Sequence, residues 1–254
     1  MRRLLFSTIV VVALTGCSAS QLAGTEAPKS TSGGAPSAAA TTAVTEASGA
    51  DVQVVMTYVL PFKSDTGGGG VQIIVAIKNQ GGGVAKVGGM DSETWTLYGK
   101  DGTVLETGDL TPAPQFLAAG ETGYLLGWTN FSGDAQFTQV DKAEPSITFS
   151  AADNVPPETI KAEKVVVRPD EYKIWLEATG TVTNVGTEKV SLGTLAIVLF
   201  DANGTPLGWL QDSASVMGLL PSQKKGFSTN YGFVPASVAS KVKTLGIYTY
   251  ELAL

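Results

Sequence analysis

The stretch LFDANGTPL, residues 199–207, decides the fold class of this chain. Its pattern predicts a β-strand, a tight turn at Asn203 and Gly204, and a second strand, because glycine accepts the positive φ that such a turn demands. A similar stretch, LYGKDGTVL, occupies residues 97–105, where Asp101 and Gly102 predict a two-residue hairpin turn. One hairpin used twice predicts that the chain contains two similar halves.

The similarity extends well beyond the hairpin. At an ungapped offset of 102 residues, large apolar side chains of the first half recur in the second. The pairs include Leu97 with Leu199, Leu117 with Leu219, Phe131 with Phe233, and Val140 with Val242. Upstream, the turn signal NQG at 79–81 matches NVG at 184–186 at an offset of 105. The difference between the two offsets falls in a loop, where insertion costs little.

The rest of the chain favours the same fold class. Short apolar runs separated by turn signals about every ten residues are typical of a β-sandwich. We therefore predict an all-β protein with two tandem immunoglobulin-like β-sandwich domains, at residues 51–150 and 161–254. A Pro-containing hinge at 151–160 would join them. Before them we expect a signal peptide at 1–16 and then, at 17–50, a lipidated cysteine followed by a disordered tether.

The strand before each hairpin resembles a known family. A strand with a WxLYG or IxLFD core, preceded by an NxG turn and followed by a glycine turn, is similar to the FxLYD-type domain. The matching residues are Trp95, Leu97, Tyr98 and Gly99 in the first half, and Ile197, Leu199, Phe200 and Asp201 in the second. The resemblance implies immunoglobulin-like sandwiches of about a hundred residues, found in bacterial and archaeal surface proteins and lipoproteins. It implies a fold and carries almost no information about function.

The N-terminal sequence predicts where in the cell the protein is located. Arg2 and Arg3 precede an apolar run, Leu4–Leu14, which is too short for a transmembrane helix and fits a secretion signal. The run ends in LTGC at 14–17, which resembles the bacterial lipobox. The resemblance implies cleavage before Cys17 and a diacylglycerol on its sulfur, which would anchor the exported protein to the outer face of the cell membrane. The alternative is an ordinary signal peptide with a cysteine there by chance.

Composition restricts the chemistry. Without residues 1–16 the chain has 15 basic and 23 acidic residues, a net charge of −8, which argues against nucleic acid as a partner. The chain has no histidine, and so lacks the commonest general base and the commonest transition-metal ligand. Its single cysteine excludes an internal disulfide and a thiolate metal cluster. We predict no cofactor.

Two groups of acidic side chains are candidates for a metal site or a catalytic site. Five carboxylates lie close together in the first half, and a calcium site there is conceivable, although carboxylates on strand faces and turns are usually solvated surface groups. They are Asp91, Glu93, Asp101, Glu106 and Asp109. In the second half, a glycosidase-like acid pair could be drawn from Asp170, Glu171 and Glu177, but the sequence gives no separation to test.

A third candidate is the SxxK spacing of Ser222 and Lys225. In penicillin-binding enzymes this motif begins a helix, whereas here it follows Pro221 in an expected β-turn. We therefore predict a turn and no nucleophile at Ser222, and no enzymatic activity for the chain.

Tryptophans are the remaining candidates for a binding surface. Trp95 and Trp175 lie in apolar strands and are expected in the core. Trp128 precedes a loop and Trp209 follows the second hairpin, so these two have the better claim to exposure and are the candidate partner-binding residues, although a core role is the commoner one for each.

These expectations together predict a non-enzymatic lipoprotein of the cell envelope, attached to the membrane through lipidated Cys17. Its two domains would interact with envelope proteins or with a cell-wall polymer. The alternatives are a small-ligand-binding lipoprotein with a pocket between the domains, and an envelope hydrolase.

Overall fold

The structure is a computed structural model that describes residues 49–63, 69–88, 92–131, 138–229 and 232–251. The regular elements in these ranges are antiparallel β-strands and one short 3-10 helix, Ala236–Lys241 (η1). The prediction of an all-β sandwich fold is therefore confirmed. The expected signal peptide, Cys17 and nearly all of the tether lie outside the described residues. No helix among the described residues is both long enough and apolar enough to span a membrane.

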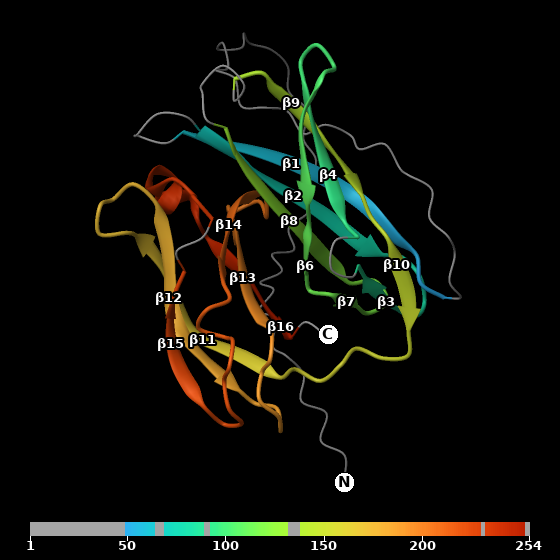
Figure 1. Ribbon diagram of the computed structural model, residues 1–254, viewed down its shortest axis with the longest axis vertical. Coiled ribbons are helices and arrows are strands. Elements are labelled where there is room, and N and C mark those ends of the chain that lie inside the picture. The colour runs from blue at the N-terminus through green and yellow to red at the C-terminus, as the bar shows by residue number, and fades with distance from the viewer. Residues whose placement is uncertain (1–48, 64–68, 89–91, 132–137, 230–231, 252–254) are drawn as a thin grey trace, which may run out of the picture. The chain divides into compact units, whose positions relative to one another are not determined.

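The first half contains two main sheets and a smaller one (Figure 1). The first sheet has the order β1 (Val52–Lys63), β2 (Gly69–Asn79), β8 (Thr122–Phe131), β6 (Thr111–Ala113). The second has the order β5 (Val104–Asp109), β4 (Thr94–Gly99), β9 (Val140–Ser146). The small sheet has the order β10 (Phe149–Ala152), β3 (Val84–Val87), β7 (Phe116–Leu117). Buried side chains of β2, β4 and β8, including Ile73, Trp95 and Leu125, share one core.

The second half repeats this arrangement, but among its described residues it has no small sheet and no counterpart of β6. One sheet has the order β11 (Ile160–Pro169), β12 (Leu176–Asn184), β15 (Lys224–Ser228). The other has the order β14 (Pro206–Asp212), β13 (Gly193–Phe200), β16 (Thr244–Glu251). A separate core lies between them and includes Ile160, Leu199 and Phe227. The two halves therefore have matching strand orders as well as matching sequences.

The duplicated hairpin has the same geometry in both halves. Gly102 (φ 81°) and Gly204 (φ 78°) each donate a backbone hydrogen bond to the residue three positions earlier, Gly99 and Asp201. Both strand pairs also shift register just before the turn, between Leu97 and Tyr98 and at the equivalent place in β13. The expected two-residue turn is therefore wrong: a four-residue turn ends in a left-handed glycine, which adds one residue to the loop and produces the bulge.

The loop containing Ser222 is also duplicated, and it confirms the predicted turn. Ser222 (φ 63°) occupies the position of Gly120 (φ 77°). Each donates its backbone N–H to the carbonyl of the buried asparagine of its own half, Asn184 or Asn79, at 3.0 and 2.8 Å. The conformation belongs to the turn, so the SxxK spacing there needs no catalytic explanation.

We expect Ser222→Gly to stabilise the protein. An L-residue in the left-handed region is strained by about 1–2 kcal/mol, and glycine gives back part of the gain through its more flexible unfolded chain. The net increase in the free energy of unfolding should be about 0.5–1 kcal/mol, measured by urea denaturation. Ser237→Gly, at an exposed position in η1, is the matched control and should destabilise. An unchanged or lower stability of Ser222→Gly would contradict the strain argument.

A third cluster of buried side chains joins the halves, and we call this contact the junction. Along β2, Ile73 and Val75 face the first core while Ile74 faces the other way; along β13, Leu199 faces the second core while Phe200 faces away. The outward-facing residues pack together with the side chain of Trp209. Both strands are buried on both faces for this reason.

Trp209 is only 2% exposed, so its candidate role as a partner-binding residue is corrected, and it is a core residue. Its indole Nε1 donates to the carbonyl of Gly127 at 3.3 Å. The side-chain amide of Gln72 accepts from the backbone N–H of Trp209 at 3.0 Å and donates to its carbonyl at 2.9 Å. The sheet of the first half covers the tryptophan, a contact that sequence position alone does not reveal.

Candidate functional site

Four aromatic rings from both halves form a cluster at one edge of this junction. Phe233 stacks on Phe62 at 5.6 Å between ring centroids, with an interplanar angle of 19°. Trp175 meets Phe62 and Phe233 edge-on, at 5.8 and 5.7 Å, and Trp128 lies 5.9 Å from Phe233. Trp128 remains 38% exposed, so it lies outside the core. The cluster combines a packed interior with accessible aromatic surface.

The loop between β11 and β12 positions Trp175. Asp170 Oδ1 accepts hydrogen bonds from the backbone N–H groups of Ile174, at 2.9 Å, and Trp175, at 3.3 Å. The Asp170 N–H donates to the Trp175 carbonyl at 2.8 Å, which closes the loop. Lys173 adopts a left-handed conformation (φ 58°) within it. At the tip, Tyr172 is 72% exposed, the largest exposure among the exposed apolar and aromatic side chains of the described residues.

The segment leading into η1 holds the other side of the site. Leu176 donates its backbone N–H to the carbonyl of Val234 at 2.7 Å, and Ala236 donates to Ile174 at 2.8 Å. Between these anchors and β15, Phe233 has a positive φ of 46°. A bulky residue in this region is strained by about 1–2 kcal/mol, and such strain is concentrated at functional sites.

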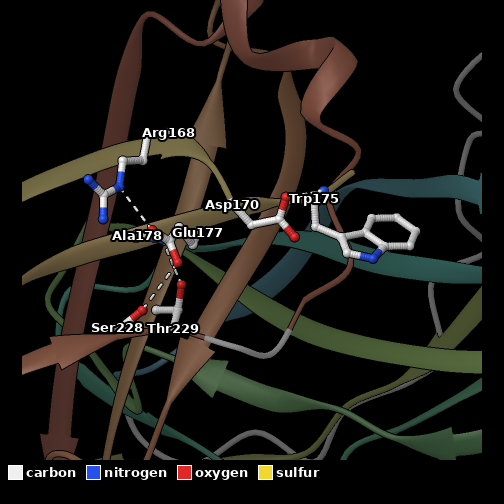
Figure 2. A network of polar contacts seen from close by, with 7 residues as sticks. All are labelled: Arg168, Asp170, Trp175, Glu177, Ala178, Ser228 and Thr229. Atoms are coloured by element: carbon white, nitrogen blue, oxygen red, sulfur yellow. Dashed lines mark hydrogen bonds and ion pairs between the residues drawn. The ribbon is translucent and has the colours of Figure 1, made fainter. Parts of the chain in front are cut away.

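An open cleft of about 670 Å³ lies beside the aromatic cluster. Its aromatic lining is Tyr172, Trp175 and Phe233, and its charged lining is Arg168, Asp170, Glu171 and Glu177. Figure 2 shows Asp170 with the indole of Trp175 on one side and the Arg168–Glu177 pair on the other.

The polar wall of the cleft is well ordered by hydrogen bonds. Arg168 Nε donates to Glu177 Oε1 at 2.9 Å, and Ser228 Oγ donates to Glu177 Oε2 at 3.4 Å. Thr229, below them, is buried and accepts from the backbone N–H of Ala178 at 2.8 Å. Since the Arg168 side chain is 62% exposed, this ion pair contributes little to stability, and it serves mainly to fix the position of the carboxylate.

A smaller pocket of about 210 Å³ adjoins the cleft and is lined by both halves. Phe233 lines both hollows. The other lining residues of the pocket are almost all apolar: Leu60, Pro61, Phe62, Pro206, Leu207, Val234, Pro235 and Val238. The single polar residue there, Gln72, is already bonded to the backbone of Trp209.

The structure brings together three residues that the sequence placed in one group. Asp170, Glu171 and Glu177 all line the cleft, but Asp170 binds loop N–H groups and Glu177 binds Arg168. Trp175, expected in the core, is instead half-buried in the cleft wall. Sequence reasoning did not identify Tyr172 or Phe233 as site residues. The available signal was the run YKIW at 172–175, in which apolar side chains occupy a turn.

The other candidates lie elsewhere. Asp101 stabilises its own turn by accepting from the backbone and hydroxyl of Thr103. Glu93 is fully buried rather than solvated, and its Oε1 accepts from the hydroxyl of Thr148 at 2.8 Å. Within the described ranges, no group of three or more carboxylate or thiol side chains could hold a metal ion. Asp91 and Cys17 lie outside those ranges.

No family model and no curated protein matches the sequence. A solved structure similar to this chain is that of red sea bream transglutaminase, with a TM-score of 0.22 and 15% sequence identity. The similarity covers 79% of this chain and 29% of the other, so this chain spans less than a third of that protein's length.

Proposed function

We propose that this protein is an exported, lipid-anchored, non-enzymatic binding protein of the bacterial cell envelope. Its two immunoglobulin-like sandwiches form a scaffold that presents the cleft between Arg168 and Phe233 to an envelope protein or a wall polymer. The proposed site of lipid attachment is Cys17, at the end of the LTGC motif. The low-complexity stretch that follows would act as a flexible tether between the membrane and the scaffold.

The observation that carries the proposal is the accessible aromatic surface around the cleft. Tyr172 is 72% exposed and Trp128 is 38% exposed, beside the half-buried rings of Trp175 and Phe233. Large aromatic side chains are costly to leave in water, and Trp and Tyr are enriched among the few residues that carry most of the binding energy at protein interfaces. Ring contacts hold Trp128, Trp175 and Phe233 in place, which reduces the entropy lost on binding.

The alternatives have weaker support. A small-ligand carrier would need a pocket of roughly 300–1,000 Å³, and the pocket shared by the halves is about 210 Å³. A hydrolase would need a free pair of carboxylates at the cleft. Asp170 and Glu177 are both held by hydrogen bonds that build the wall, which leaves Glu171.

The proposal is tested by photo-crosslinking in intact cells of the organism that carries the protein. A photoreactive amino acid at Tyr172 should give a discrete crosslinked species with an envelope protein or wall fragment. The same amino acid at Val104, an exposed position on β5 of the first half, is the matched control and should not. In parallel, Cys17→Ser should release the protein from the membrane fraction. Equal crosslinking at both positions would refute a binding role for the cleft.

A further inference from the structure

We infer that the cleft and the adjoining pocket are one composite site for an extended, basic and apolar peptide segment of a partner protein. A Lys or Arg side chain occupies the cleft beside Glu171 and Tyr172, and an aliphatic side chain fills the pocket. This inference rests on the proposed function and specifies the class of ligand.

The charge of the cleft selects the sign of the ligand. Three carboxylates and one guanidinium line it, and that guanidinium, of Arg168, is already bonded to Glu177. The cleft therefore keeps a negative excess, and Glu171, next to the exposed ring of Tyr172, contributes to it from an exposed position. A carboxylate beside an aromatic face favours a cation, through charge complementarity and cation–π attraction.

The pocket selects an apolar group next to that cation. Its lining offers one polar side chain, the amide of Gln72, and both ends of that amide are used by Trp209. A sugar hydroxyl placed there would find no free polar side chain to replace its hydrogen bonds to water, which is unfavourable. An aliphatic side chain would instead gain from leaving water. The pair of hollows thus fits a peptide better than a glycan.

Phe233 makes the two hollows one site. It lines both of them, and its ring contacts both Phe62 and Trp175, which also contact each other. An extended peptide crossing this ring places successive side chains on opposite sides of its backbone. One side chain can therefore enter the pocket while a neighbour reaches the cleft.

The experiment measures binding of defined peptides to the full chain carrying Cys17→Ser, by fluorescence anisotropy. The probes are short labelled peptides in a Gly/Ser background that contain one Lys and one Leu at varied spacings. Two control peptides replace Lys by Glu, or Leu by Ser. We expect saturable binding of at least one Lys/Leu peptide and about tenfold weaker binding of both controls.

Three protein variants at exposed positions complete the test, with circular dichroism as the check on folding. Glu171→Lys and Pro61→Lys, at the cleft and at the pocket, should each weaken binding of the best peptide about tenfold. Glu158→Lys is the matched control, because it precedes the opposite end of β11, and it should leave binding unchanged.

Each other outcome has a defined meaning. Equal affinity for the Lys and Glu peptides, or an unaffected Glu171→Lys variant, would overturn the inference. Binding of soluble wall-glycan fragments that is lost in Tyr172→Ala but retained in Glu171→Lys would also overturn it, while leaving the proposed binding role of the cleft intact. If the Tyr172 crosslink in cells is absent as well, the proposed function itself fails.

Discussion

Replacing Trp209 by alanine is expected to lower the free energy of unfolding by about 3–5 kcal/mol. The side chain is 2% exposed and packs with Ile74 and Leu126 of the first half and with Val198 and Phe200 of the second. Truncation leaves a cavity that two rigid sheets cannot close, and removes the indole donor from the Gly127 carbonyl.

The same substitution should also reduce the coupling between the halves. Trp209 belongs to the cluster of buried residues that joins them, so the unaltered protein should unfold in one cooperative transition. In Trp209→Ala the junction contributes less, and the transition should broaden or separate into two.

Urea denaturation followed by circular dichroism measures both effects. Trp128→Ala is the matched control, since it removes the same number of atoms from a side chain that is 38% exposed. Its cost should be about 1 kcal/mol or less. Similar losses in the two variants would show that Trp209 does not have the special role inferred from its burial.

Two neighbouring tyrosines of the junction are uncharged in the physiological pH range. Tyr124 lies 5.5 Å from Phe200 and 6.0 Å from Tyr248, between ring centroids. Burial raises the pKa of the Tyr124 and Tyr248 phenols above the usual value near 10. Both rings therefore stay neutral at neutral pH, and no charge is forced into the contact.

The hairpins could be predicted from the sequence because their causes are local. Gly102 and Gly204 adopt positive φ, and Asp201 Oδ1 accepts from the N–H groups of Asn203 and Thr205 within its own turn. A short stretch contains all of these partners. The exact loop length depends on a bulge in the paired strands, and for that reason the expected two-residue turn was one residue too short.

The junction could not be predicted in the same way, because it is made by residues far apart in the chain. Gln72 and Trp209 are separated by 137 positions and still share two hydrogen bonds. The sequence did contain a weak signal: the runs VQIIVAI at 71–77 and LAIVLF at 195–200 alternate little, as strands buried on both faces do. Such runs indicate a second contact without identifying the partner surface.

The cleft depends on long-range placement to an equal degree. Asp170, Glu171 and Glu177 are close in sequence. The walls are completed by Ser228, the last residue of β15, and by Phe233, which follows that strand. Their approach follows from the pairing of β12 with β15 and from the bridge between Trp175 and Pro235. Aromatic residues at strand ends could suggest from the sequence that a site exists. The shape of that site could not be predicted without the fold.

Replacing either of two buried asparagines, Asn79 or Asn184, by alanine should lower the free energy of unfolding by about 2–4 kcal/mol. Both are 0% exposed and stand at equivalent places in the repeat. Asn79 Nδ2 donates to the carbonyl of Leu117 at 3.1 Å, and Asn184 Nδ2 donates to the carbonyl of Leu219, the equivalent residue, at 2.9 Å. Each asparagine therefore ties the end of one strand to a segment of the same sandwich that is distant in sequence: the end of β7 for Asn79 and the loop before β15 for Asn184.

The decrease in the free energy of unfolding should be larger for Asn79→Ala, in the first half, than for Asn184→Ala. Asn79 also donates to Gly83 and accepts from the N–H groups of Asp51 and Gly81. Asn184 has fewer such contacts, donating to Glu188 and accepting from Gly186. Alanine leaves every one of these backbone groups without its side-chain partner. The carbonyls of Leu117 and Leu219 are bonded in buried surroundings, and the penalty for an unsatisfied buried group exceeds the net value of a hydrogen bond.

Denaturation of the two single variants and the double variant measures these costs. Asn203→Ala is the matched control, because the Asn203 side chain is exposed and only the backbone N–H of this residue donates to Asp201, which alanine preserves. This substitution should lower the free energy of unfolding by about 0.5 kcal/mol or less. Since Asn79 and Asn184 share no partner, their effects should add in the double variant. A cost for Asn79→Ala no greater than that of Asn203→Ala would contradict the argument that a duplicated asparagine stabilises each sandwich from within.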